Sequence, residues 1–95
     1  FVYVEKLYLV RNNCKKICSE FKINKQHFKH LRYLNLEGNN IESWDEIEGF
    51  RVLNEMTHLI VNKNQIREIY MKPGFRSLKY LSFEDNLIAT WKSFD

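Results

Sequence analysis

The 95-residue sequence has few of the residues that break or crosslink a chain: one proline, three glycines and two cysteines. It contains no signal peptide, no N-x-S/T glycosylation acceptor and no apolar run near the ~18 residues that a membrane helix needs. Two cysteines without secretory marks indicate reduced thiols rather than a disulfide framework. These absences favour a cytoplasmic protein that does not act on membranes.

The composition is that of an ordinary globular protein, with 44% hydrophobic and 28% charged residues. The net charge is only +3, and the acidic residues are interspersed with the basic ones. A nucleic-acid-binding protein more often gathers lysine and arginine on one face, so nucleic acid is not an expected partner. The locally basic run at residues 22–29 is interpreted as a solvated helix face.

A repeated pattern organises the chain. Residues 31–44 read L-x-x-L-x-L-x-x-N-x-I-x-x-W, which is the strand-and-turn half of a leucine-rich repeat. Three other stretches, beginning at Val4, Met56 and Leu78, place apolar residues in the same slots. The asparagine position of the pattern is occupied by Asn12, Asn39, Asn64 and Asn86, which we call the slot asparagines. They recur every 22 to 27 residues, as this repeat class requires.

The predicted fold class is therefore α/β. We expect a leucine-rich-repeat solenoid of about four repeats, with parallel concave β-strands and helical or irregular convex segments. One domain is expected over residues 1–95, with repeats of about 1–30, 31–55, 56–77 and 78–95. Neither end offers a polar capping repeat, which predicts a segment of a longer protein. Strands are expected at residues 6–10, 58–62 and 80–84, besides the strand of the 31–44 stretch.

The segments on the convex side carry different signals. Residues 19–30 are predicted to form a helix with Ser19 as a possible N-cap. The sequence S-W-D-E at 43–46 has the form of a capping box, which predicts that a helix begins there. Gly49 lies within this expected helix and predicts that it is short. The pair Pro73-Gly74 argues against a full helix in the third repeat.

Two residue types have predicted structural roles. Each slot asparagine follows a strand where the chain bends, and its amide can pair with backbone groups that lose their strand partners there. Trp44 and Trp91 share one slot, where the other repeats have Ile17 and Ile69. We expect both tryptophans to be large core residues.

The residue types that bind metals or catalyse reactions in other proteins do not form such a site in this sequence. The arrangement C-x3-C-x8-H-x2-H, made by Cys14, Cys18, His27 and His30, is shorter than a zinc finger, and Cys14 falls in an inward slot. The outward carboxylates Glu37 and Glu84 should lie roughly 10 Å apart as a solvated rim. No phosphate-binding loop is present. The prediction is a protein without enzymatic activity, metal or cofactor.

The predicted concave surface is the informative one. Alternation along the strands gives three rows: Lys6, Tyr33, His58, Tyr80; then Tyr8, Asn35, Ile60, Ser82; then Val10, Glu37, Asn62, Glu84. Tyrosine-rich mixed surfaces are typical of protein interfaces. The candidate partner-binding residues are Tyr8, Tyr33, Asn35, Glu37, His58, Ile60, Asn62, Tyr80, Ser82 and Glu84. A charged rim is expected from Arg11, Lys63, Arg67 and Asp85.

The phrase I-x-S/T-W-x-x-I/F occurs twice, within residues 40–47 and 87–94. These turns resemble the repeats of the tubulin-folding cofactor E (tubulin-specific chaperone E) family. The resemblance implies a cytosolic chaperone that binds α-tubulin and works with other tubulin cofactors to assemble or dissociate the heterodimer. The glycine-rich microtubule-binding domain and the ubiquitin-like domain of that family are not in these residues, and Ile69 replaces the tryptophan in the third repeat. No tubulin-contact residue carries over.

The sequence therefore predicts a protein-binding module of a tubulin-folding cofactor. The alternative is a leucine-rich-repeat regulatory scaffold of the phosphatase-regulating or spliceosomal type, which has the same fold but a different protein partner.

Overall fold

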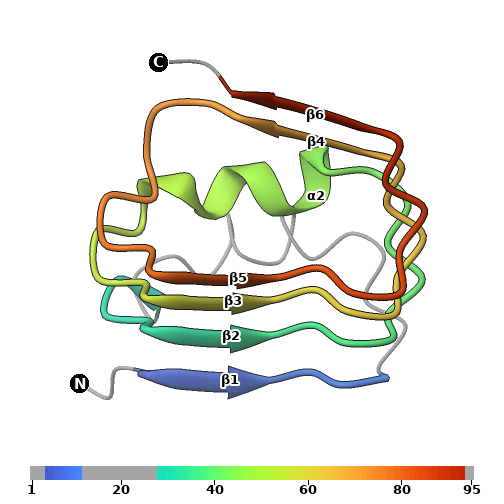
Figure 1. The fold of residues 1–95 in the computed structure, drawn as a ribbon. Helices are drawn as coiled ribbons and strands as arrows, with labels where there is room; N and C mark the ends of the chain where they lie inside the picture. Colours follow the sequence, from blue (N-terminus) through green and yellow to red (C-terminus); the bar gives the residue numbers. More distant parts are fainter. Residues whose placement is uncertain (1–3, 12–27, 94–95) are drawn as a thin grey trace.

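The computed structural model describes residues 4–11 and 28–93. Its main sheet has four parallel strands in the order β1-β2-β3-β5 (Figure 1). They are β1 (Lys6–Tyr8), β2 (Tyr33–Asn35), β3 (His58–Ile60) and β5 (Tyr80–Ser82). A second sheet, on the opposite side of the molecule, pairs β4 (Glu68–Met71) in parallel with β6 (Thr90–Ser93) (Figure 1). The described returns, from β2 to β3 and from β3 to β5, thus cross the side of the molecule opposite the main sheet (Figure 1).

The strands of the main sheet are three residues long, shorter than the predicted five. Their backbone pairing continues beyond the assigned ends, since Leu9 N donates to Asn35 O at 2.9 Å and Arg11 N donates to Glu37 O at 2.8 Å. The regular strand geometry ends because the chain turns there into a bend.

That bend has a left-handed residue at one recurring position. The residue before each slot asparagine has a positive φ, with values of 57° at Arg11, 69° at Gly38, 57° at Lys63 and 55° at Asp85. Such angles suit glycine and cost energy for other residues. At Gly38 the space is also tight, since an added Cβ would lie 3.1 Å from Cγ of Arg11.

One helical segment is described between the two sheets. It consists of α2 (Asp45–Glu48) and the 3-10 helix η1 (Gly49–Val52). The predicted short helix is confirmed. The predicted capping box forms only in part. Ser43 Oγ accepts a hydrogen bond from Asp45 N at 3.1 Å, whereas the Glu46 carboxylate finds no such partner among the described residues and its Oε2 is buried.

Two other predictions concern the far side of the molecule. After β4 the chain forms turns rather than a helix, so the prediction from Pro73-Gly74 is confirmed. The helix predicted at 19–30 falls almost entirely outside the described residues.

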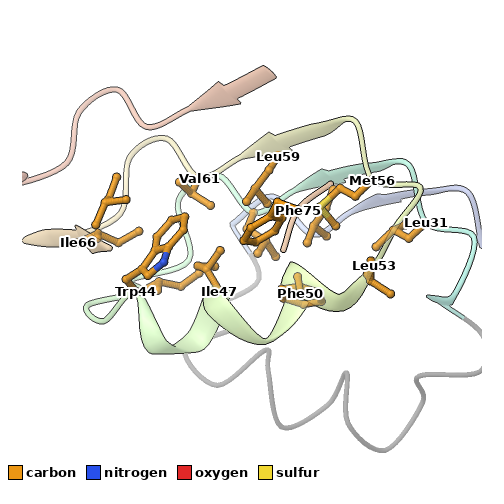
Figure 2. Packing of buried hydrophobic residues seen from close by; sticks show 14 residues of the cluster. Leu31, Trp44, Ile47, Phe50, Leu53, Met56, Leu59, Val61, Ile66 and Phe75 are labelled. Atoms are coloured by element: carbon orange, nitrogen blue, oxygen red, sulfur yellow. The ribbon is translucent and has the colours of Figure 1, made fainter. Parts of the chain in front are cut away.

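The hydrophobic core lies between the main sheet on one side and α2, η1 and the second sheet on the other (Figures 1 and 2). Leu34 and Leu59 point inward from β2 and β3 and are fully buried, as are Ile47 of α2 and Ile69 of β4. The inward residues at the two edges of the sheet, Leu7 and Leu81, are only partly buried.

The leucine-rich pattern and the parallel strands with little helix agree with the predicted α/β class, while the count of four repeats and the solenoid remain predictions. Within the described part of the chain, no helix is long and apolar enough to cross a membrane.

Candidate protein-binding face

A ladder of asparagines fixes the bends that follow the strands of the main sheet. Asn64 Nδ2 donates to Leu36 O at 3.0 Å and to Val61 O at 2.9 Å, and its Oδ1 accepts hydrogen bonds from the backbone N–H groups of Asn39 and Ile41. These bonds tie one bend to the bend before it. Because only 5% of Asn64 is exposed, these hydrogen bonds form away from water.

The neighbouring slot asparagines act in the same way. Asn39 Nδ2 donates to Leu9 O at 2.6 Å, and Asn86 Nδ2 donates to Val61 O at 2.9 Å. Asn86 Oδ1 also accepts from Ile66 N at 3.1 Å. The predicted role is confirmed at all three positions, while Asn12 lies outside the described residues.

The strand register reproduces the first two of the three rows predicted from alternation. The first row contains Lys6, Tyr33, His58 and Tyr80, and the second contains Tyr8, Asn35, Ile60 and Ser82. We call the side of the main sheet that carries these two rows the outer face. It is directed away from the core, because the leucines between the two rows point to the opposite side.

Four aromatic rings contact one another across this face. The ring centroids of Tyr8 and Tyr33 are 5.0 Å apart, those of Tyr33 and His58 are 5.8 Å apart, and those of His58 and Tyr80 are 5.6 Å apart. All three spacings fall in the favourable range for aromatic pairs. The two end members remain accessible, with 56% of Tyr8 and 50% of Tyr80 exposed. We call Tyr8, Tyr33, His58 and Tyr80 together the aromatic row, although Tyr8 belongs to the second of the two strand rows and the others to the first.

The polar candidate residues lie at the carboxyl ends of the main-sheet strands. Asn62 Oδ1 accepts hydrogen bonds from Ser82 Oγ and from Glu84 N, both at 2.7 Å, and Ser82 is 9% exposed. Asn35 Oδ1 accepts from Glu37 N at 3.0 Å. These amides hold the carboxyl ends of the strands, so much of their hydrogen-bonding capacity is already used within the chain.

Charged residues flank the carboxyl ends of the strands. Arg11, Lys63 and Asp85 are exposed and share the left-handed turn position, so they form an edge of the outer face as predicted. Arg67 does not join them in the same way. It precedes β4 of the second sheet and lines a pocket with Trp44 and Tyr70.

The two tryptophans differ in burial. Trp44 is 1% exposed and packs beside Ile47 and Ile66 (Figure 2), as predicted. For Trp91 the core prediction is wrong, since 47% of this residue is exposed. It pairs with Ile69 in the second sheet and contacts the ring of Phe83, but this sheet consists of β4 and β6 alone, so β6 has a strand neighbour on one side only among the described residues. No described strand covers its other side.

The zinc-finger-like residues are only partly placed by the structure. Cys14, Cys18 and His27 lie outside the described residues, and the imidazole of His30 is hydrogen-bonded to the carboxylate of Glu55. Among the residues that the structure describes, no group of three or more histidine, cysteine, aspartate or glutamate side chains could hold a metal ion.

One group of charged residues was missed by the sequence interpretation. Arg32, Arg76 and Lys79 line one pocket at the amino-terminal ends of the main-sheet strands. The available signal was that Arg32 and Lys79 each directly precede a strand, β2 and β5, at equivalent repeat positions. Arg76 carries no such repeat signal.

The chain was compared with known proteins. The sequence model of the Leucine Rich Repeat family matches residues 30–53. Tubulin-folding cofactor E of Arabidopsis thaliana is 34% identical to this chain over 67 residues, which cover 70% of the chain and 13% of that relative. No solved structure matches. The parallel strands, the asparagine ladder and the buried Trp44 turn fit the same assignment. The chain therefore belongs to the tubulin-folding cofactor E family, as a leucine-rich-repeat part of it.

Proposed function

We propose that this chain is a non-catalytic protein-binding module of a tubulin-folding cofactor that docks α-tubulin on its outer face. Docking would serve assembly or dissociation of the tubulin heterodimer, together with other tubulin cofactors, in the cytoplasm. The observation that carries the proposal is the aromatic row of Tyr8, Tyr33, His58 and Tyr80, which crosses all four strands of the main sheet.

The aromatic row has the properties of an interface centre. Tyrosines bring a large contact area with few rotatable bonds, so ordering them on binding costs little entropy. Here the rings already contact one another in the free chain and are held by a hydrogen-bonded sheet. Thr57 Oγ1 lies 2.9 Å from His58 Nδ1, which orients the imidazole within the row. Ile60 in the second row adds an apolar side chain beside the rings.

The proposal includes the remaining expectations from the sequence. Residues 1–95 would form one domain, with a surface that engages protein rather than nucleic acid, membrane, metal or cofactor. The other polar candidates are Asn35, Glu37, Asn62, Ser82 and Glu84. They would position the face and contribute its rim more than its centre, because the side chains of Asn35, Asn62 and Ser82 already bond within the chain.

The test is binding of the purified chain to αβ-tubulin, followed by pull-down and titration. The double substitution Tyr33→Ala with Tyr80→Ala should weaken binding at least about tenfold, because truncating aromatic anchors of an interface commonly costs 1–2 kcal/mol or more each. A matched control is Val52→Ala with Leu87→Ala, which removes exposed apolar side chains (59% and 56% exposed) away from the outer face.

Unchanged affinity after the tyrosine substitutions would contradict docking on the outer face. A wild-type chain that binds no tubulin would reject α-tubulin as the partner and would favour a scaffold with a different protein partner.

A further inference from the structure

A pocket of about 410 Å³ opens at the amino-terminal ends of the main-sheet strands, which is the left end of these strands in Figure 1. It lies beyond the first row of the outer face, because Arg32, Thr57 and Lys79 each come directly before a residue of that row. The turn between β4 and β5 completes the pocket with Arg76 and Ser77. We call Arg32, Arg76 and Lys79 the basic rim.

The backbone beneath the basic rim is fixed by the sheet. Thr57 N donates to Arg32 O at 2.9 Å, and Lys79 N donates to Thr57 O at 2.9 Å. Since neighbouring strands lie about 4.8 Å apart, the backbones of Arg32 and Lys79 are separated by roughly 10 Å. The sheet therefore fixes the distance between the backbone positions from which the Arg32 and Lys79 side chains extend.

Arg76 extends from an anchored turn. The preceding residue, Phe75, is 7% exposed, and its N–H donates to Arg51 O at 2.7 Å. The following residue, Ser77, donates from Oγ to Asn54 O at 2.5 Å. Because the turn is held on both sides of Arg76, this arginine adds a third cation at a defined place near the other two.

The charges around this pocket do not balance. Arg76 and Lys79 are exposed and form no ion pair with any described residue, whereas Glu55 is the one acidic side chain that lines the pocket. Glu55 is already engaged by His30, and its Oε1 lies 3.6 Å from Arg32, whose side chain is 61% exposed. Three cations facing one shared carboxylate attract further negative charge.

The form of the pocket distinguishes between anions. Compact phosphate sites direct several free backbone N–H groups at one point. Here the backbone N–H groups of His58, Lys79 and Tyr80 are used within the sheet. The available donors are long side chains spread over roughly 10 Å. This spacing suits two or more separate carboxylates along a peptide better than one phosphate group.

We propose that the basic rim binds an acidic peptide segment of a partner protein, with at least two aspartate or glutamate side chains placed along the amino-terminal edge of the sheet. The inference goes beyond the docking of α-tubulin, because it assigns a second surface and a partner chemistry without depending on which protein supplies the segment.

The test is a titration of the 95-residue chain with a fluorescent peptide rich in glutamate and aspartate. A peptide of the same length with glutamine and asparagine in their place is the ligand control. Arg76→Glu with Lys79→Glu should weaken binding at least about tenfold, since it replaces two attractions by two repulsions. Lys63→Glu with Arg67→Glu makes the same change in net charge at two positions outside this pocket, and this variant should retain most of the affinity.

Two further measurements sharpen the test. Glu55→Gln should tighten binding about twofold or more, because it removes the one carboxylate that competes for the rim. Raising the salt concentration from about 0.1 M to about 1 M should abolish binding, since the screening length falls from about 10 Å to about 3 Å. Arg76→Gln with Lys79→Gln serves as a milder variant, and thermal unfolding of each variant verifies folding.

Three outcomes would overturn the proposal. The first is equal loss of affinity in the rim variant and in the Lys63/Arg67 control variant, which would show a general charge effect. The second is equal binding of the uncharged peptide. The third is tighter binding of a single-stranded oligonucleotide of the same charge, which would identify the rim as a nucleic-acid site. Tyr33→Ala with Tyr80→Ala should leave peptide binding intact, so failure here is separable from failure of tubulin docking.

Discussion

Asn64 Oδ1 accepts a hydrogen bond from the backbone N–H of Asn39 at a distance of 2.9 Å, although the two residues are 25 positions apart. The asparagine of one bend thus satisfies the backbone of the preceding bend. Asn86 bonds in turn to Val61 O and to Ile66 N. These hydrogen bonds join the bends of successive repeats through buried polar groups. Each of these bends therefore depends on the next one for part of its hydrogen bonding.

The first prediction concerns this coupling. Asn64→Ala should lower the free energy of unfolding by about 3 kcal/mol, because it leaves the carbonyls of Leu36 and Val61 and the N–H of Ile41 without these bonds. Asn39→Ala should cost about 1–3 kcal/mol. Urea unfolding measures both, and Asn54→Ala at an exposed position is the control. A midpoint for Asn64→Ala equal to that of the wild type would contradict the assigned role.

The second prediction uses the left-handed position before the slot asparagine. Gly38→Ala should destabilise the chain by about 1–3 kcal/mol, because a Cβ is strained at φ 69° and would lie 3.1 Å from Cγ of Arg11. Lys63→Ala changes the same repeat position, where a Cβ is already present at φ 57°, and should cost less than about 0.5 kcal/mol. Thermal unfolding compares the two variants. Similar losses in both would show that conformation at this position does not limit stability.

The third prediction compares the two tryptophans. Trp44→Ala should cost about 3–5 kcal/mol, since it empties a fully packed site, and Trp91→Ala should cost less than half as much. Trp44→Phe should be far milder than Trp44→Ala, because it leaves an aromatic ring in the site and removes the buried Nε1, which has no hydrogen-bond partner among the described residues. Fluorescence of single-tryptophan variants gives an independent measure: acrylamide should quench Trp91 and largely spare Trp44.

The fourth prediction concerns the turn that carries Arg76. Gly74→Ala should destabilise the chain by more than Gly38→Ala does, because its Cβ would lie 2.7 Å from Cβ of Arg51 and 2.8 Å from the Arg51 backbone oxygen. Backbone cannot yield as a flexible side chain does. Pro73→Ala is the neighbouring control, since it preserves the carbonyl that accepts from Arg51 Nη1 at 3.1 Å. Unfolding midpoints of the two variants should separate clearly.

Much of the outer face was predictable from local sequence. Side chains of a strand alternate between its two faces, so the spacing of Leu34 and Leu36 already assigns Tyr33 and Asn35 to the opposite side. The repeat then aligns Tyr33 with His58 and Tyr80, and the observed register agrees. What alternation cannot show is whether an outward polar group is available, and Asn62 and Ser82 bond to each other.

The sequence by itself determined the inward leucines, the order of the rows and the asparagine bends, because each follows from a short period that is read along the chain. Only the tertiary structure decided the second sheet of β4 and β6, the exposure of Trp91 and the meeting of Arg32 with Arg76 and Lys79. These features depend on which segments of different repeats lie side by side and on which residues cover the edges of the two sheets. Such contacts join residues that are far apart along the chain, and no local period encodes them.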